Sequence, residues 1–256
     1  MKTTTWFRLV ALFTGCFLLV NSSRTYADFL SIKVTKYDST FTTASGSVTL
    51  TSTSLPSNPT TIQLSPGLIS GLYNGVPLSL GLVDPFAGDV DWSVTASANL
   101  PGSTTPAVGQ LDSLVFASHS PTATSYFLRV EVISDGYTLP GISGSAVQAS
   151  ATFASSEVSD GQSTLSSAIG LSTIGSTLFT PSVTSSPLFT LNTTRGANYT
   201  LTNSFDISLT GNVAGDSTST VNLSATTKVV PEPSTVVLLL SGAVVFRRKL
   251  IRRRGV

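Results

Sequence analysis

Apolar and polar side chains alternate with a period of two through most of the chain, and few folds accept this pattern. The clearest example is Tyr126–Ile133, with the sequence YFLRVEVI, and Tyr199–Leu209 alternates over eleven residues. Successive side chains of a strand point to opposite faces, so each segment offers one face to a core and one to solvent. The period predicts that Phe127, Arg129 and Glu131 share one side of their strand.

The composition also favours strands over helices. Charged residues make up only 11% of the chain, and Ser, Thr, Gly and Val are abundant. Thr and Val favour extended backbone, whereas the strong helix formers Lys, Glu, Met and Gln are scarce. The other alternating segments are Phe29–Tyr37, Ser47–Thr51, Trp92–Ala96, Leu111–Ala117, Ala146–Phe153, Leu188–Thr193 and Ser217–Val229. We therefore expect an all-β domain over residues 28–228, an antiparallel β-sandwich or jelly roll of about ten strands.

Turn signals predict where some of these strands reverse. Asn74-Gly75 stands between Leu68–Tyr73 and Val76–Leu80, which is a hairpin pattern. Asp135-Gly136 and Asp160-Gly161 are further turn candidates.

Three weaker patterns bear on the rest of the domain. Leu165–Ile174 carries a faint helical stripe, the only one in the domain. Alternation between Asn203 and Lys228 predicts a final hairpin. A flexible neck is expected just before Pro231.

The charge distribution separates the body from the C-terminal end. Residues 28–228 hold five cations and twelve anions, a net charge of −7, while six cations follow at Arg247, Arg248, Lys249, Arg252, Arg253 and Arg254. An acidic body without clustered Lys or Arg argues against nucleic acid as a partner. The single cysteine, Cys16, lies before the body, so the body has no disulfide, thiolate metal site or cysteine nucleophile.

The N-terminal 27 residues have the three parts of a secretory signal peptide. Lys2 and Arg8 supply positive charge, Leu9–Val20 is apolar, and a polar segment ends at Ala27. We expect cleavage between Ala27 and Asp28. The alternative is an uncleaved anchor helix, but a spanning helix needs about 20 apolar residues and this run has twelve.

The C-terminal segment 229–256 combines a proline motif, an apolar run at 234–246 and a basic tail at 247–254. In this order the three parts resemble the PEP-CTERM sorting signal of exported bacterial proteins. The resemblance implies that Pro231, Glu232 and Pro233 are recognised by an exosortase-type transpeptidase. It further implies transient anchoring in the inner membrane, followed by delivery to the cell surface or extracellular matrix.

The apolar run itself is short for a membrane anchor. Thirteen residues form a helix of roughly 20 Å, against roughly 30 Å for the hydrocarbon core. A short transmembrane helix suits a temporary anchor, and an ordinary tail anchor is the alternative. The body also resembles, at Arg129–Pro140 and Tyr199–Asp206, the extracellular β-domains that often precede this tail, which implies no particular chemistry.

Few residues of the body are candidates for chemistry. His119, the sole histidine, precedes Ser120-Pro121 and is expected in a solvated loop, with no partner pattern for catalysis. Asp84, Asp89 and Asp91 are candidate calcium ligands, although Asp is also common in turns.

These observations leave three functional hypotheses. The first is an exported structural or interaction protein without catalysis or cofactor. The second is a carbohydrate-binding module, with or without calcium, that uses a cleft lined by Trp92 to hold extracellular polysaccharide. The third is a β-sandwich hydrolase, which requires two carboxylates such as Glu131 and Asp135 to converge.

Overall fold

The computed structural model describes residues 29–231, apart from residues 53–60, 67, 72–76, 79–80, 99–108, 120–124, 138–142, 160, 183–186 and 211–218. The expected signal peptide 1–27, its cleavage site at Ala27 and Asp28, and the tail from Glu232 onward, including Pro233, lie outside the described residues. The turn at Asn74-Gly75 also lies outside them. Within the described ranges, no helix has the length and apolarity to cross a membrane.

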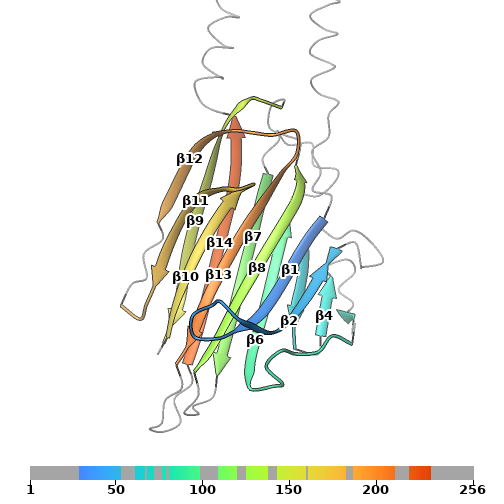
Figure 1. Ribbon diagram of the computed structural model, residues 1–256, viewed down its shortest axis with the longest axis vertical. Helices are drawn as coiled ribbons and strands as arrows, with labels where there is room; N and C mark the ends of the chain where they lie inside the picture. Colours follow the sequence, from blue (N-terminus) through green and yellow to red (C-terminus); the bar gives the residue numbers. More distant parts are fainter. Residues whose placement is uncertain are drawn as a thin grey trace, which may run out of the picture.

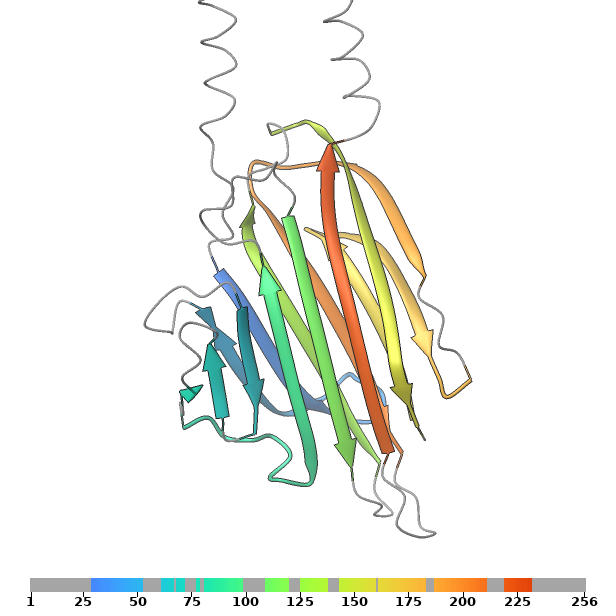
Figure 2. The ribbon, with the colours of Figure 1, turned by 180° about the vertical axis from the view of Figure 1, so that it is seen from behind.

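Two antiparallel sheets pack face to face, which confirms the predicted all-β sandwich (Figures 1 and 2). The six-stranded sheet has the spatial order β11 (Ser172–Phe179), β10 (Gly161–Ile169), β13 (Tyr199–Leu209), β8 (Tyr126–Tyr137), β1 (Phe29–Tyr37) and β2 (Ala44–Thr51). The eight-stranded sheet has the order β12 (Leu188–Thr194), β9 (Ala146–Val158), β14 (Ser219–Pro231), β7 (Gly109–His119), β6 (Val90–Ala98), β3 (Thr61–Ser65), β4 (Leu68–Gly71) and β5 (Pro77–Leu78).

Alternation places the core between the sheets, as the sequence predicts. Every second residue of β13 is buried, and Phe205 has no exposed surface. Phe153 and Phe179 are also fully buried, so aromatic side chains from both sheets fill the interior. Each fully buried side chain of this size contributes roughly 1.5–3 kcal/mol. Arg129 and Glu131 lie on the half-buried outward positions of β8, as expected.

A polar bridge crosses this apolar interior. The Thr227 hydroxyl of β14 donates to Asn203 Oδ1 of β13 at 2.7 Å and lies 2.6 Å from the Ser167 hydroxyl of β10. All three side chains are buried. A buried polar group is costly unless it is hydrogen-bonded, so this bridge favours one alignment of the two sheets. No pattern in the sequence indicates this bridge.

Several expected connections are different in the structure. β13 and β14 belong to different sheets, so the predicted final hairpin is wrong and the chain crosses between layers there. The chain also crosses between the sheets from β9 to β10, which begins at Gly161. Asp160, the first residue of the turn expected there, lies outside the described residues. The hairpin expected around Asn74-Gly75 is supported by its strands, since Ile69 pairs with Leu78.

Two local predictions are also wrong. The faint helical stripe at Leu165–Ile174 is the hairpin of β10 and β11, which turns at Gly170 with a positive φ of 56°. Asp135-Gly136 is not a turn but part of β8. Gly136 has a φ of 87°, and β8 pairs irregularly with β13 at this point. A glycine at positive φ with a register shift is typical of a bulge.

Both described ends of the chain lie at one end of the sandwich, called here the terminal end. β1 starts there at Phe29 and β14 finishes there at Pro231 (Figures 1 and 2). Pro231 still pairs with Val147 of β9, so the flexible neck expected before it is instead strand. The opposite, distal end carries the β1–β2 loop, residues 81–89 and the start of β8.

Candidate functional site

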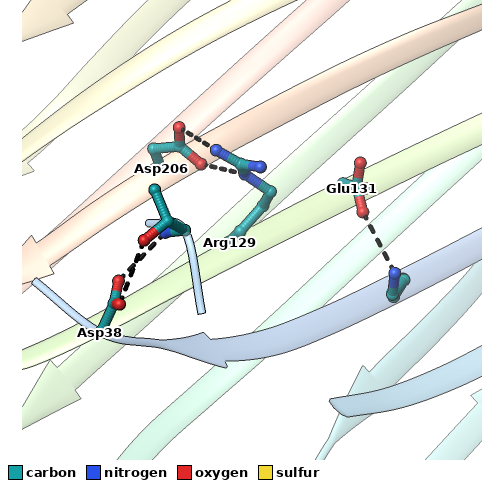
Figure 3. Close-up of polar contacts among 6 residues, drawn as sticks. Asp38, Arg129, Glu131 and Asp206 are labelled. Carbon is teal, nitrogen blue, oxygen red and sulfur yellow. Dashed lines mark hydrogen bonds and ion pairs between the residues drawn. The ribbon is translucent and has the colours of Figure 1, made fainter. Parts of the chain in front are cut away.

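The outer face of the six-stranded sheet carries a charged strip formed by Lys33, Arg129, Glu131 and Asp206. Arg129 Nε and Nη2 donate to Asp206 Oδ1 and Oδ2 at 2.5 and 2.8 Å, a two-point pair between β8 and β13 (Figure 3). Lys33 Nζ lies 3.7 Å from Glu131 Oε2. The Asp206 carboxylate raises the pKa of Arg129 above its ordinary value. The four charges therefore neutralise each other on neighbouring strands.

Three half-buried aromatic residues continue this face toward the distal end. This aromatic cluster contains Tyr37, Phe41 and Phe127. The Phe41 ring is 6.0 Å from Tyr37 and meets Phe127 edge-on at 5.7 Å. The Arg129 guanidinium lies over Tyr37 at 5.1 Å and over Phe41 at 5.9 Å. Arg129 thus joins the charged strip to the aromatic cluster through a cation–π contact.

The β1–β2 loop is held by one carboxylate. Asp38 accepts hydrogen bonds from the backbone N–H groups of Thr40 and Thr42 at 3.1 and 3.0 Å and from both hydroxyls. Figure 3 draws Asp38 with one of these partners. These donors lower the pKa of Asp38 well below its ordinary range. The loop closes over Phe41, which has a φ of 55°. Positive φ is uncommon for a bulky residue, so the loop holds Phe41 in a strained conformation over the sheet.

The predicted calcium ligands do not form one site. Asp84 accepts from the N–H groups of Phe86 and Gly88 at 3.0 and 2.8 Å and from the indole N–H of Trp92 at 3.1 Å. Asp89 accepts from the Tyr126 hydroxyl at 2.9 Å. In the described part of the chain, no three His, Cys, Asp or Glu side chains gather as metal ligands would.

Asp91, the third candidate, is exposed on β6, while Asp84 organises the turn that precedes that strand. Trp92 is almost entirely buried. The cleft that we expected it to line is therefore not formed by this side chain. Trp92 is a core residue whose one polar atom is satisfied by Asp84.

The side chain of Lys36 covers the distal end of the core, which the sequence did not lead us to expect. Lys36 Nζ lies 5.6 Å from the centre of the Phe86 ring and 5.4 Å from that of Tyr126. Burial and the neighbouring Asp89 raise the pKa of the Tyr126 hydroxyl. Lys36 is an inward position of β1, where the alternation predicts an apolar residue. Its ammonium group reaches the open end of the sandwich, and its stem covers the core.

The candidate catalytic residues are also separated. His119 is the last residue of β7 and pairs with Val90 and Ser219, so its expected place in a loop is wrong. Glu131 pairs with Lys33, whereas Asp135 accepts a hydrogen bond from the Thr200 hydroxyl. Four residues of strand place Glu131 and Asp135 about 13 Å apart along β8. This arrangement does not suit a carboxylate pair acting on one bond.

The outer face of the eight-stranded sheet is broad and polar, and its exposed charged side chains on β6 and β14 are Asp91 and Lys228. The other outward polar side chains on β9, β14, β12 and β6 include Gln148, Ser150, Thr152, Asn222, Ser224, Thr226, Thr190, Asn192, Thr194, Ser93, Thr95 and Ser97. Cross-strand hydrogen bonds link some of them. Gln148 donates to Asn192 at 3.2 Å, and Gln63 of β3 donates to Ser93 at 3.1 Å. This hydroxyl face can exchange hydrogen bonds with neutral polar surfaces.

Comparisons with known proteins give no family for this chain. No protein-family model and no curated protein matches it. Among solved structures, carbohydrate-binding module CBM36 in complex with calcium and xylotriose is similar over 42% of this chain and 76% of its own, with 18% identity and a TM-score of 0.18. Infectious bursal disease virus, Gx strain, is similar over 84% and 59%, with 10% identity and a TM-score of 0.24.

A family 16 carbohydrate-binding module is similar over 50% of this chain and 84% of its own, with 8% identity and a TM-score of 0.15. At TM-scores this low, none of these similarities bears on function. The function of the chain is therefore argued from its own residues.

Proposed function

We propose that the protein is exported and acts at the cell surface or in the extracellular matrix as a structural or interaction protein, without catalysis. The observation that carries this proposal is the wide polar face of the eight-stranded sheet. Four of the candidate carboxylates are engaged in structural contacts, namely Asp84, Asp89, Glu131 and Asp135, whereas this face offers mainly hydroxyl and amide groups. Such groups match the hydroxyl groups of polysaccharides, so extracellular polysaccharide is the proposed partner.

The delivery route follows from the ends of the chain. The signal peptide 1–27 directs export, and an exosortase-type transpeptidase acts on the motif Pro231, Glu232 and Pro233 while the tail is held in the inner membrane. The position of Pro231 supports this route, because the strand β14 leads directly into the motif. During anchoring the terminal end of the sandwich faces the membrane and the distal end faces away from it.

Mass spectrometry of the mature termini tests the route. Protein is prepared from separated inner-membrane and extracellular fractions of the native host. We expect extracellular protein that starts at Asp28 and ends between Pro231 and Ser234. Protein that keeps residues 247–254 in the inner membrane at steady state would make it a tail-anchored protein instead.

Affinity electrophoresis in gels containing neutral polysaccharide tests the partner. The variant Thr152→Glu/Thr226→Glu places two charges at a cross-strand pair in the middle of the polar face. We expect the polysaccharide to retard the original protein and to retard this variant less. The control Thr49→Glu/Ser47→Glu carries the same charge on exposed positions of β2, in the other sheet. Equal retardation of all three proteins would exclude this face as the contact.

A further inference from the structure

The two sheets end together on one side of the sandwich, at β11 and β12. Each is the last strand of its sheet, and no described strand pairs with its outer side. The two strands lie beside each other along this side (Figures 1 and 2). On the opposite side the eight-stranded sheet ends in β5, which has only two residues. Among the described strands, the β11–β12 side therefore presents two long edges, whereas the opposite side presents β2 and the short β5.

This edge lacks the features that usually prevent strands from pairing with other molecules. β11 has the sequence STIGSTLF and β12 has LFTLNTT, with no charged residue and no proline in either. Edge strands of soluble proteins are commonly protected by Lys, Pro or short length, because their free N–H and C=O groups are templates for another strand. The bulge between β10 and β11 lies on the inner side of β11 and leaves its outer side open.

Each edge strand also carries an exposed leucine. Leu178 is 49% exposed on β11 and faces outward from the six-stranded sheet, whereas Leu188 is 65% exposed on β12 and faces outward from the eight-stranded sheet. Leu171 is fully exposed at the β10–β11 turn. The edge thus combines backbone hydrogen-bonding groups with apolar side chains on both outer faces of the sandwich.

A second copy of the same chain fits this edge, because both edge strands are uncharged and an antiparallel strand edge is complementary to its own copy. The ion pairs of the six-stranded sheet lie on its central strands β1, β8 and β13, and none lies on β10 or β11. Two copies can therefore approach through this edge without repulsion between like charges. A two-fold axis perpendicular to the sheets aligns each edge strand antiparallel to its own copy, which is the geometry of a closed dimer.

We propose that the protein self-associates through the β11–β12 edge, pairing β11 with β11 and β12 with β12 of a second copy to form continuous sheets. The proposal does not depend on the export route or on polysaccharide binding. It predicts an assembly whose terminal ends point in opposite directions along the strands, because the paired strands are antiparallel.

Sedimentation equilibrium of the full chain in detergent measures the association. We expect a concentration-dependent dimer, and we expect Thr190→Lys/Leu178→Lys to raise its dissociation constant at least about tenfold by placing like charges against their copies. The control Thr49→Lys changes an exposed threonine on β2, at the other side of the sandwich, and should leave association unchanged. A monomer at all concentrations, or equal weakening by the control, would overturn the proposal.

Cysteine cross-linking tests whether the β12 strands of two copies are in contact, and it does not depend on the stability of the lysine variant. In a Cys16→Ser background the chain contains no cysteine. A single Thr190→Cys should then give a disulfide-linked dimer under mild oxidation, whereas Thr49→Cys should not. Efficient cross-linking at residue 49, or none at residue 190, would show that the edge is not the contact.

Discussion

A single methyl group at residue 175 should test how closely the two sheets approach near β12. An alanine Cβ at this position would lie 2.5 Å from Phe189 Cβ and 2.6 Å from Phe189 Cδ1. Carbon atoms in contact prefer 3.5–4.0 Å, so Phe189 must retreat by about 1 Å. Its ring packs at 5.7 Å from that of Phe153, which is fully buried in the core.

We therefore expect Gly175→Ala to destabilise the domain by about 1–3 kcal/mol, the usual cost of overpacking a filled interior. For a domain of this size each kcal/mol lowers the Tm by about 2–4 °C. Urea unfolding followed by circular dichroism measures the change. The matched control Ser176→Ala lies on the exposed side of the same strand and should stay within about 0.5 kcal/mol.

A double-mutant cycle identifies the cause. In a Phe189→Gly background neither the ring nor the Cβ fixes the spacing, so the cost of Gly175→Ala should fall by about half or more. An equal cost in both backgrounds would mean that the loss arises from β11 itself. An unchanged stability of Gly175→Ala alone would mean that the sheets can separate here without cost, contrary to the packing described above.

Three further results are expected. Asp206→Asn should cost about 1–2 kcal/mol of unfolding free energy, because Arg129 keeps its half-buried charge and loses a two-point partner; urea unfolding that matches the original protein would contradict this. The folded-state pKa of Asp38 is lowered, so its stabilisation should be complete above the ordinary carboxyl pKa near 4 and decline as pH falls; the Tm difference between the original protein and Asp38→Asn, measured from pH 2 to 7, should shrink on acidification, and a difference that grows would refute it. Asp84→Ala should shift Trp92 fluorescence and cost about 1–3 kcal/mol, while millimolar calcium should leave the original Tm unchanged; a calcium-dependent rise would restore Asp84 as a ligand.

The strand pattern could be predicted because inward and outward positions differ in chemistry. β13 and β8 alternate between large apolar and polar side chains. The bounds of β13 were predicted in full, whereas β8 continues from the predicted end at Ile133 to Tyr137. β3, β10 and β11 were not anticipated, so the segments expected from the sequence match eleven of the fourteen strands that the described residues form. In β10 many positions are Ser or Ala, and Ser163 and Ser167 are buried, so hydrophobicity does not separate the two faces.

The sites were harder to predict because long-range partners decide their chemistry. The three aspartates near Trp92 are close in sequence, but Asp84 and Asp89 accept hydrogen bonds from different neighbours, and no three acidic side chains of the described residues gather as metal ligands would. Arg129 was placed on the outward face correctly, whereas its partner Asp206 is 77 residues away. The residues around Lys36 do not indicate that its side chain covers the end of the core. Its position continues the inward series of β1, where an apolar residue is expected.

The position of β14 has a mechanical consequence. This strand, which ends at Pro231, lies inside the eight-stranded sheet and pairs along nearly its whole length with both β7 and β9. Antiparallel hydrogen bonds run perpendicular to the strands, so a pull along β14 loads its two ladders in shear and all at once. An edge strand pulled the same way would lose half that resistance, and a strand pulled sideways would unzip bond by bond. Tension applied through the C-terminal tail would therefore act on a central strand, whose two hydrogen-bond ladders must break together before the strand is extracted.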